Sequence, residues 1–135
     1  SPARRALRQF GLELGLAFQI VDDVLDFESD PVTLGKPVLN DLGEGKLTLP
    51  AVAALRRGDE ATRRALAAVI ADRGFTRVSE DEVVRLVRQS GGLDEAKALA
   101  AAAASRARAA LASLPACPSR DALEFATEYA VARAY

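Results

Sequence analysis

The sequence contains no histidine, no tryptophan and no methionine among its 135 residues, and it has a single cysteine, Cys117. Without histidine, the chain cannot form imidazole zinc sites, Ser-His-Asp triads or a histidine general base. One cysteine excludes an internal disulfide framework. Any metal ion that this chain binds must therefore be held by oxygen ligands.

The sequence also has no excess of either charge, and it has no long apolar run. It has 18 Lys and Arg against 19 Asp and Glu, a net charge of −1. A chain without an overall positive field lacks the attraction that holds nucleic acid or an anionic membrane. No apolar run approaches the roughly 20 residues of a membrane span, and the first residues lack a secretory signal. We therefore expect a cytoplasmic protein with no nucleic-acid partner and no stable membrane insertion.

Aromatic residues make up only 5% of the chain, and β-branched residues form no alternating runs. Alanine and leucine dominate instead, which favours helices over sheet. The first residues already follow a helical pattern without a convincing start signal. We expect one all-α domain over residues 1–135, a helical bundle that is a fragment of a longer protein. Proline, glycine and capping residues predict helices at about 3–28, 50–57, 60–72, 80–89, 93–114 and 119 to the C-terminus.

Local signals add detail to these helices. Ser79 and Glu82 form a capping-box pattern. The alanine run at 100–104 is typical of close helix packing, because small side chains let helices approach. The last helix should bury its Phe125 and Tyr129 side. A loop of roughly 18 residues follows the first helix, longer than a simple connector needs, which indicates a functional segment.

Three carboxylates gather near the end of the first predicted helix. Asp22, Asp23 and Asp26 occupy positions i, i+1 and i+4, on one polar stripe with Gln19. The opposite face should bury into the bundle, and it contains Ala17, Ile20, Val24, Phe27 and Leu16.

A solvated helix face is the simplest interpretation of this stripe, but it fits poorly. Aspartate is a weak helix former, like charges at i,i+4 repel, and carboxylates near a helix C-terminus oppose the macrodipole. No Lys or Arg occurs between Arg8 and Lys36 to compensate. Clustered carboxylates suit a hard cation such as Mg²⁺, which binds one or two carboxylates together with waters and phosphates. The sequence therefore predicts a metal site at Asp22, Asp23 and Asp26.

Two lysines follow on the glycine-containing loop. Lys36 lies after Gly35, and Lys46 follows Gly45. Isolated loop lysines are usually just solvated. Next to an acidic helix they indicate a diphosphate site, with the metal bridging protein and substrate and the lysines binding phosphate oxygens.

These residues, in this order, resemble the second aspartate-rich region of trans-isoprenyl diphosphate synthases, the polyprenyl synthetase family. The resemblance rests on FQIVDDVLDF at 18–27, GKP at 35–37, Asp41-Leu42 and EGKLTLP at 44–50. Weaker similarity reaches the last helices through Gly91-Gly92, Arg120, Tyr129 and Arg133. One departure is Val38-Leu39, which replaces a stretch that often contains glycine.

The resemblance implies the C-terminal part of the isoprenoid synthase fold and a Mg²⁺-dependent, head-to-tail condensation of isopentenyl diphosphate with an allylic diphosphate. In the family, Asp22 would bind Mg²⁺ directly, and Asp23 and Asp26 would be further ligands or would hold its waters. Lys36 and Lys46 would bind the allylic diphosphate and stabilise its leaving charge. Phe18 and Gln19 would border the reacting carbons.

The family's first aspartate-rich motif is not present in this sequence. The resemblance therefore implies that the chain alone is inactive or nearly so, and that it binds Mg²⁺ weakly without substrate. Helix faces left uncovered should be buried by self-association, as a homodimer or a larger assembly.

Two other functions remain open at this stage. The chain could be a naturally short, non-catalytic helical subunit that regulates a catalytic prenyl synthase. It could also belong to a class I terpene cyclase, which ionises allylic diphosphates without condensing them. The Gly35-Lys36 and Glu44-Gly45-Lys46 elements favour a synthase over a cyclase, because the second motif of cyclases is usually of an Asn/Ser/Glu type.

Overall fold

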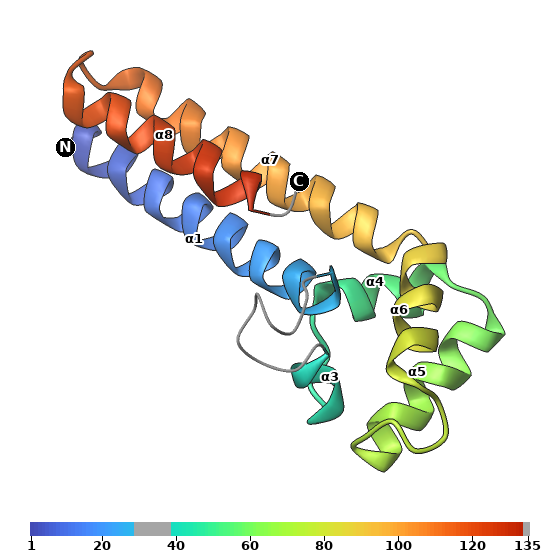
Figure 1. Cartoon of the computed structure of the whole chain (residues 1–135). Helices are drawn as coiled ribbons and strands as arrows, with labels where there is room; N and C mark the ends of the chain where they lie inside the picture. The colour runs from blue at the N-terminus through green and yellow to red at the C-terminus, as the bar shows by residue number, and fades with distance from the viewer. Residues whose placement is uncertain (29–38, 134–135) are drawn as a thin grey trace. The chain divides into compact units, whose positions relative to one another are not determined.

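The computed structural model describes residues 1–28 and 39–133, which are helical with short connections and, within those ranges, contain no strand. The helices are drawn in Figure 1. The elements are α1 (Pro2–Glu28), α3 (Asn40–Gly43), α4 (Leu49–Arg57), α5 (Glu60–Asp72), α6 (Glu80–Gln89), α7 (Gly92–Ala110), a 3₁₀ turn (Leu111–Ser113) and α8 (Pro118–Ala132). The predicted all-α class is confirmed. None of the described helices is long and apolar enough to cross a membrane.

Two expected boundaries differ from the structure. The predicted loop after the first helix contains the short helix α3. The long alanine-rich helix ends at Ala110 and continues as the 3₁₀ turn, which tightens the chain before Pro115. Both differences concern helix ends and short helices, for which local sequence signals are weakest.

The contacts divide the chain into two compact units, which we describe separately. Unit 1 comprises Ser1–Val21 and Lys97–Tyr135, and unit 2 comprises Asp22–Ala96. Helices α1 and α7 each contribute residues to both units. The expectation of a single domain therefore stays a prediction.

Unit 1 is built from α8 and from parts of α1 and α7, which lie side by side in Figure 1. One cluster buries Phe10 with Ala107 and Leu111, and a second buries Ala17 with Ala103 and Ala104. Alanine supplies most of the α7 side of these contacts, so the helices can approach closely. This confirms the packing role predicted for the alanine run.

Two predicted core faces of unit 1 are partly wrong. Phe125 and Tyr129 are 65% and 60% exposed, and α8 instead buries Thr127 and Ala130. Residues two apart on a helix point to nearly opposite sides, so burying Thr127 turns Phe125 outward. On α1, Leu16 is 47% exposed, although Ala17 and its other predicted neighbours are buried.

Glu13 interrupts the apolar side of α1, and the structure explains why it is tolerated there. Its carboxylate accepts hydrogen bonds from Gln9 Nε2 at 2.9 Å and from Arg106 Nε at 3.0 Å. Only 14% of the Glu13 side chain is exposed. An ion pair with α7 therefore accompanies the alanine contacts of unit 1.

Unit 2 contains α3, α4, α5 and α6, and α4, α5 and α6 contact one another pairwise. The junction between α6 and α7 packs tightly on α4. A Cβ atom at Gly92 would lie 2.7 Å from the Pro50 carbonyl oxygen and 3.0 Å from the Ala54 backbone nitrogen. Only glycine allows this approach of two backbones.

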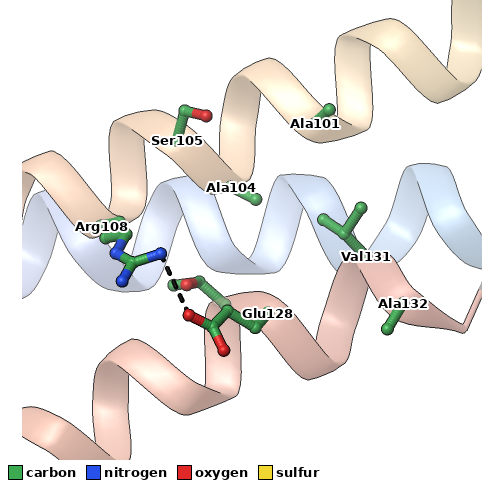
Figure 2. Close-up of a pocket in the computed structure, with 8 residues that line it drawn as sticks. Ala101, Ala104, Ser105, Arg108, Glu128, Val131 and Ala132 are labelled. Atoms are coloured by element: carbon green, nitrogen blue, oxygen red, sulfur yellow. Dashed lines mark ion pairs between the residues drawn. The ribbon is translucent and has the colours of Figure 1, made fainter.

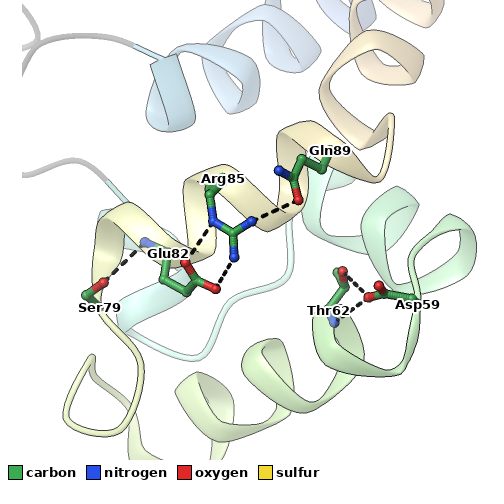
Figure 3. Close-up of polar contacts among 6 residues, drawn as sticks. All are labelled: Asp59, Thr62, Ser79, Glu82, Arg85 and Gln89. Atoms are coloured by element: carbon green, nitrogen blue, oxygen red, sulfur yellow. Dashed lines mark hydrogen bonds and ion pairs between the residues drawn. The ribbon is translucent and has the colours of Figure 1, made fainter.

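Side chains cap α5 and α6 at their N-termini, as Figure 3 shows. Ser79 Oγ accepts the Glu82 N–H at 3.2 Å, but the Glu82 carboxylate pairs with Arg85. The Ser79 half of the predicted capping box is thus present in the structure. Asp59 Oδ1 accepts both the N–H and the hydroxyl of Thr62, each at 2.9 Å. These bonds lower the pKa of the Asp59 carboxyl, the backbone N–H of Thr62 contributing most.

The turn before α3 contains an unusual backbone. Leu39 has φ 59° and ψ 30°, in the left-handed region, and its side chain is fully buried. Its N–H donates to the Asp26 carbonyl oxygen at 3.0 Å. Leucine rarely adopts this conformation, which costs roughly 1–2 kcal/mol relative to right-handed backbone. Burial of the side chain offsets the cost, so the residue fixes the chain against the end of α1.

We predict that Leu39→Gly is at least as stable as Leu39→Ala. Both variants lose the buried side chain, at about 2–5 kcal/mol, but glycine relieves the left-handed strain. The control pair is Leu42→Ala and Leu42→Gly, because Leu42 is buried in α3 with ordinary helical backbone. At this position, the Leu42→Gly variant should be less stable than Leu42→Ala by about 1 kcal/mol. Urea unfolding measures the stability of all four variants. A Leu39→Gly variant that is less stable than Leu39→Ala would contradict the prediction.

We also predict that Asp59 makes stability depend on pH. Since its pKa is lower in the folded chain, its stabilising effect is present above the unfolded value, about 3.9, and is lost as the pH falls through the folded value. Asp59→Asn keeps an oxygen acceptor at the cap but does not titrate. Thermal melts between about pH 6 and pH 3 should therefore fall more steeply for the wild type than for Asp59→Asn. Parallel curves would contradict the prediction.

Candidate functional site

The three predicted metal ligands lie in the last two turns of α1 and belong to unit 2. Asp22 and Asp23 are partly buried, whereas Asp26 is only 1% exposed. The interpretation of the acidic stripe as a solvated helix face therefore does not hold at Asp26. Its backbone carbonyl accepts the Leu39 N–H, so the acidic turn contacts the segment that leads to α3.

The structure does not gather the three aspartates into one ligand cluster. Across residues 1–28 and 39–133, no group of three or more Asp, Glu or Cys side chains is placed to hold a metal ion. Adjacent residues such as Asp22 and Asp23 point about 100° apart around a helix, whereas Asp22 and Asp26 share a face. One or two carboxylates are what Mg²⁺ usually takes from a protein. The donor set fits such an ion, and the assignment of the three residues stays a prediction.

Lys46 is held at the end of a closed turn that follows α3. Its backbone N–H donates to the Asp41 carbonyl oxygen at 2.8 Å, and the N–H of Gly45 donates to the Leu42 carbonyl oxygen at 2.9 Å. Gly45 has φ 82°, a left-handed conformation that glycine adopts without strain. Leu42 is buried and anchors the turn within unit 2. The lysine side chain is 67% exposed and reaches solvent from this fixed backbone.

The Lys46 ammonium pairs with the carboxylate two residues before it. Nζ lies 3.0 Å from Glu44 Oε2. The hydrogen bond and charge of Glu44 raise the pKa of Lys46, with a smaller contribution from Asp41. The same pair lowers the pKa of Glu44. Both groups are therefore charged at neutral pH.

Phe18 and Gln19 lie one turn before the aspartates on α1 and belong to unit 1. The guanidinium of Arg133, the residue that follows α8, stacks on the Phe18 ring, 4.0 Å from its centroid, and its Nη2 lies 3.5 Å from the Phe18 carbonyl oxygen. Phe18 is still 41% exposed, and Gln19 is exposed as well. Lys36, the other predicted diphosphate ligand, lies outside the described residues.

Sequence reasoning missed two of these contacts. The pair of Glu44 and Lys46 could have been predicted from opposite charges on either side of a turn-forming glycine. The contact of Arg133 with Phe18 joins residues that are 115 apart in the chain. No local pattern could have revealed that contact.

Each unit contains a hollow among its described residues. A groove of about 370 Å³ runs between α7 and α8 in unit 1, where Figure 2 shows the ion pair of Arg108 and Glu128. A second, of about 580 Å³, lies between α5 and the start of α6 in unit 2. Neither is lined by a predicted site residue. The groove of unit 1 is lined by Ala101, Ala104, Ser105, Arg108, Thr127, Glu128, Val131 and Ala132.

Proteins similar to this chain include prenyl diphosphate synthases of bacteria. The all-trans-nonaprenyl-diphosphate synthase (geranyl-diphosphate specific) of Rhodobacter capsulatus is 40% identical over 130 residues, which are 96% of this chain and 39% of that protein. The geranylgeranyl diphosphate synthase of Mycobacterium tuberculosis is 44% identical over 110 residues, or 82% of this chain and 31% of that protein. The chain thus spans well under half the length of these relatives.

Solved structures of prenyl synthases have the same fold as this chain over the part that it covers. The polyprenyl synthase of Caulobacter crescentus, crystallised with calcium and isoprenyl diphosphate, is 41% identical and superposes with a TM-score of 0.87. The match covers 97% of this chain and 40% of that one. The decaprenyl diphosphate synthase of Rhodobacter capsulatus is 34% identical with a TM-score of 0.83, covering 99% of this chain and 40% of that one.

The family itself is shown by a match that includes α1, α3 and the Lys46 turn. The sequence model of the family described as "Polyprenyl synthetase" matches residues 1–88, which are more than half of the chain. The matched part includes the acidic turn at Asp22 to Asp26. The chain belongs to the polyprenyl synthetase family.

Proposed function

We propose that this chain provides the part of a trans-polyprenyl diphosphate synthase active site that binds Mg²⁺ and the allylic diphosphate. The enzyme would condense isopentenyl diphosphate head-to-tail with that allylic diphosphate. One observation supports this most strongly: the acidic turn of α1 and the anchored Lys46 turn belong to the same compact unit. The names of the two relatives described above, both prenyl diphosphate synthases, favour condensation over cyclisation.

The described residues suggest a division of roles in binding. Asp22 is partly exposed and would contact the ion directly, whereas Asp23 and the buried Asp26 would be further ligands or would hold water ligands of the ion. Calcium in the Caulobacter structure supports a divalent ion. Mg²⁺ is the proposed one, since it combines few carboxylates with substrate phosphates. When bound, it would neutralise charge on the departing diphosphate.

Lysines and apolar residues would assist the reaction in different ways. Lys46 is charged at neutral pH and would donate hydrogen bonds to phosphate oxygens as the diphosphate leaves, together with Lys36. Phe18 and Gln19 would border the allylic carbons. A wall such as Phe18 excludes water, which would otherwise quench the allylic cation before the double bond of isopentenyl diphosphate attacks it.

Because the chain spans only 39% of the Rhodobacter relative, we expect it to show no condensation activity by itself. The remaining ligands would come from elsewhere. A cytoplasmic location also remains part of the proposal. A regulatory subunit is the alternative, and binding experiments on the aspartates distinguish the two.

We predict that the chain binds inorganic diphosphate weakly, and more tightly with Mg²⁺ than without it. Asp22→Asn should weaken this binding by about tenfold or more, because it removes a ligand charge. Asp94→Asn is the matched control, since Asp94 is exposed in unit 2 at the start of α7. NMR titration with and without Mg²⁺ measures both effects. Equal binding without Mg²⁺, or an unaffected Asp22→Asn variant, would contradict the metal site and favour a regulatory subunit. Tight binding of Mg²⁺ alone would contradict a site shared with substrate.

We further propose that the chain self-associates as a homodimer or larger assembly. Exposed apolar side chains occur on two helices of unit 1, at Leu7, Leu12, Leu16, Phe125 and Tyr129. Exposed apolar groups of this size favour association in water.

Sedimentation equilibrium at micromolar concentrations should therefore show species larger than 14.3 kDa. Replacing Phe125 and Tyr129 by serine should shift the population toward monomer, whereas Ala122→Ser, at another exposed site on the same helix, should not. A wild-type chain that remains monomeric over the whole concentration range would overturn this proposal.

A further inference from the structure

The turn that presents Lys46 also fixes a competing anion beside it. Besides the bonds that fix Gly45 and Lys46, the Glu44 N–H lies 3.2 Å from the carbonyl oxygens of both Asn40 and Asp41. The backbone on both sides of the glycine is therefore fixed by main-chain bonds. The Glu44 carboxylate lies beside the lysine because the backbone places it there.

The ammonium group of Lys46 is already paired with a carboxylate of the same turn. Nζ of Lys46 lies 3.0 Å from Glu44 Oε2, and Asn40 Nδ2 lies 3.5 Å from the other carboxylate oxygen. Asp41 adds a further negative charge that acts on the same lysine. Within this turn Lys46 is thus paired with Glu44, and the side chain of Arg73 is the neighbouring cation, with its Cγ 4.0 Å from the position of a Cβ atom at Gly45.

This arrangement affects anions differently according to their charge. A metal-free diphosphate must displace one carboxylate and approach another, so repulsion offsets most of its attraction to Lys46. A diphosphate that already binds a divalent ion has less negative charge and a second attachment at the aspartates. It can therefore compete with Glu44 for the ammonium donors, of which lysine has three.

We propose that Glu44 is a specificity-determining residue, which makes Lys46 select the metal-bound diphosphate over the metal-free anion. This inference rests on the proposed function of Lys46 as a diphosphate ligand. Glu44 acts by occupying Lys46 until a ligand of reduced charge replaces it. A purely structural role for Glu44 would instead weaken the binding of both ligand forms when the residue is changed.

The test compares binding of inorganic diphosphate with and without Mg²⁺ to the 135-residue chain. Glu44→Gln should tighten binding of the metal-free anion by about 1.5- to fivefold, the range expected for an exposed ion pair. Binding with Mg²⁺ should change less, so the preference for the metal-bound form falls. Backbone amide shifts of Gly45 and Lys46 report both dissociation constants, at low ionic strength where screening is small.

Two further variants control the experiment. Glu60→Gln removes a carboxylate from another exposed pair of unit 2, with Arg64, and changes the net charge equally. It should leave both dissociation constants unchanged. Glu44→Asp keeps the charge and should retain the preference of the wild type.

Different results would overturn the two proposals. If metal-free diphosphate binds Glu44→Gln no better than wild type, or if Glu60→Gln gives the same gain, the selective role of Glu44 is wrong. If Mg²⁺ adds nothing to diphosphate binding by the wild type, the proposed function fails, whatever Glu44→Gln does to the metal-free anion.

Discussion

Asp26, the buried aspartate near the end of α1, is bonded through its backbone to the residue that precedes α3. Only 1% of this residue is exposed, in a helix whose last turns contain two further aspartates. Burying an ionised carboxylate is costly unless cations or hydrogen-bond donors compensate it. The backbone of Asp26 is in turn fixed by the Leu39 N–H. Since α3 begins at the next residue, the acidic turn and the Lys46 turn are linked through this one contact.

Leu39 shows how unit 2 stabilises a backbone that leucine alone would avoid. A left-handed residue is tolerated when its surroundings determine its position more strongly than its own preference does. Here the side chain is fully buried and the N–H is bonded, so side chain and backbone are held together. The departure from a glycine-containing stretch at this position therefore leaves the turn intact. Its cost in strain is offset by apolar contact that glycine could not make.

The sequence predicted the helices well because their ends are local. Proline at 50, the Ser79 cap and Gly91-Gly92 each act on neighbouring residues, and α4, α5 and α6 begin and end close to the expected positions. Exposure was predicted less well. Phe125 points outward because Thr127 is buried, and Asp26 is buried at the point where its backbone carbonyl accepts the Leu39 N–H. Both depend on tertiary contacts, which helical periodicity alone does not contain. The order of motifs indicated the family, but not the partner of Lys46.

Although the net charge of the chain is near zero, carboxylates and a lysine gather in two turns of unit 2 that bear on its chemistry. In the Lys46 turn the ammonium group pairs with Glu44, and the last turns of α1 contain three aspartates. In the proposed site these carboxylates would weaken the binding of a bare diphosphate, because Lys46 is already paired. A divalent ion would turn this repulsion into attraction, since it is attracted to the aspartates and reduces the charge of the diphosphate that it binds. In the proposed site, the aspartates therefore bind the ion, and the ion lowers the charge of the diphosphate so that it can bind Lys46. Without the ion, neither the aspartates nor Lys46 would bind substrate strongly.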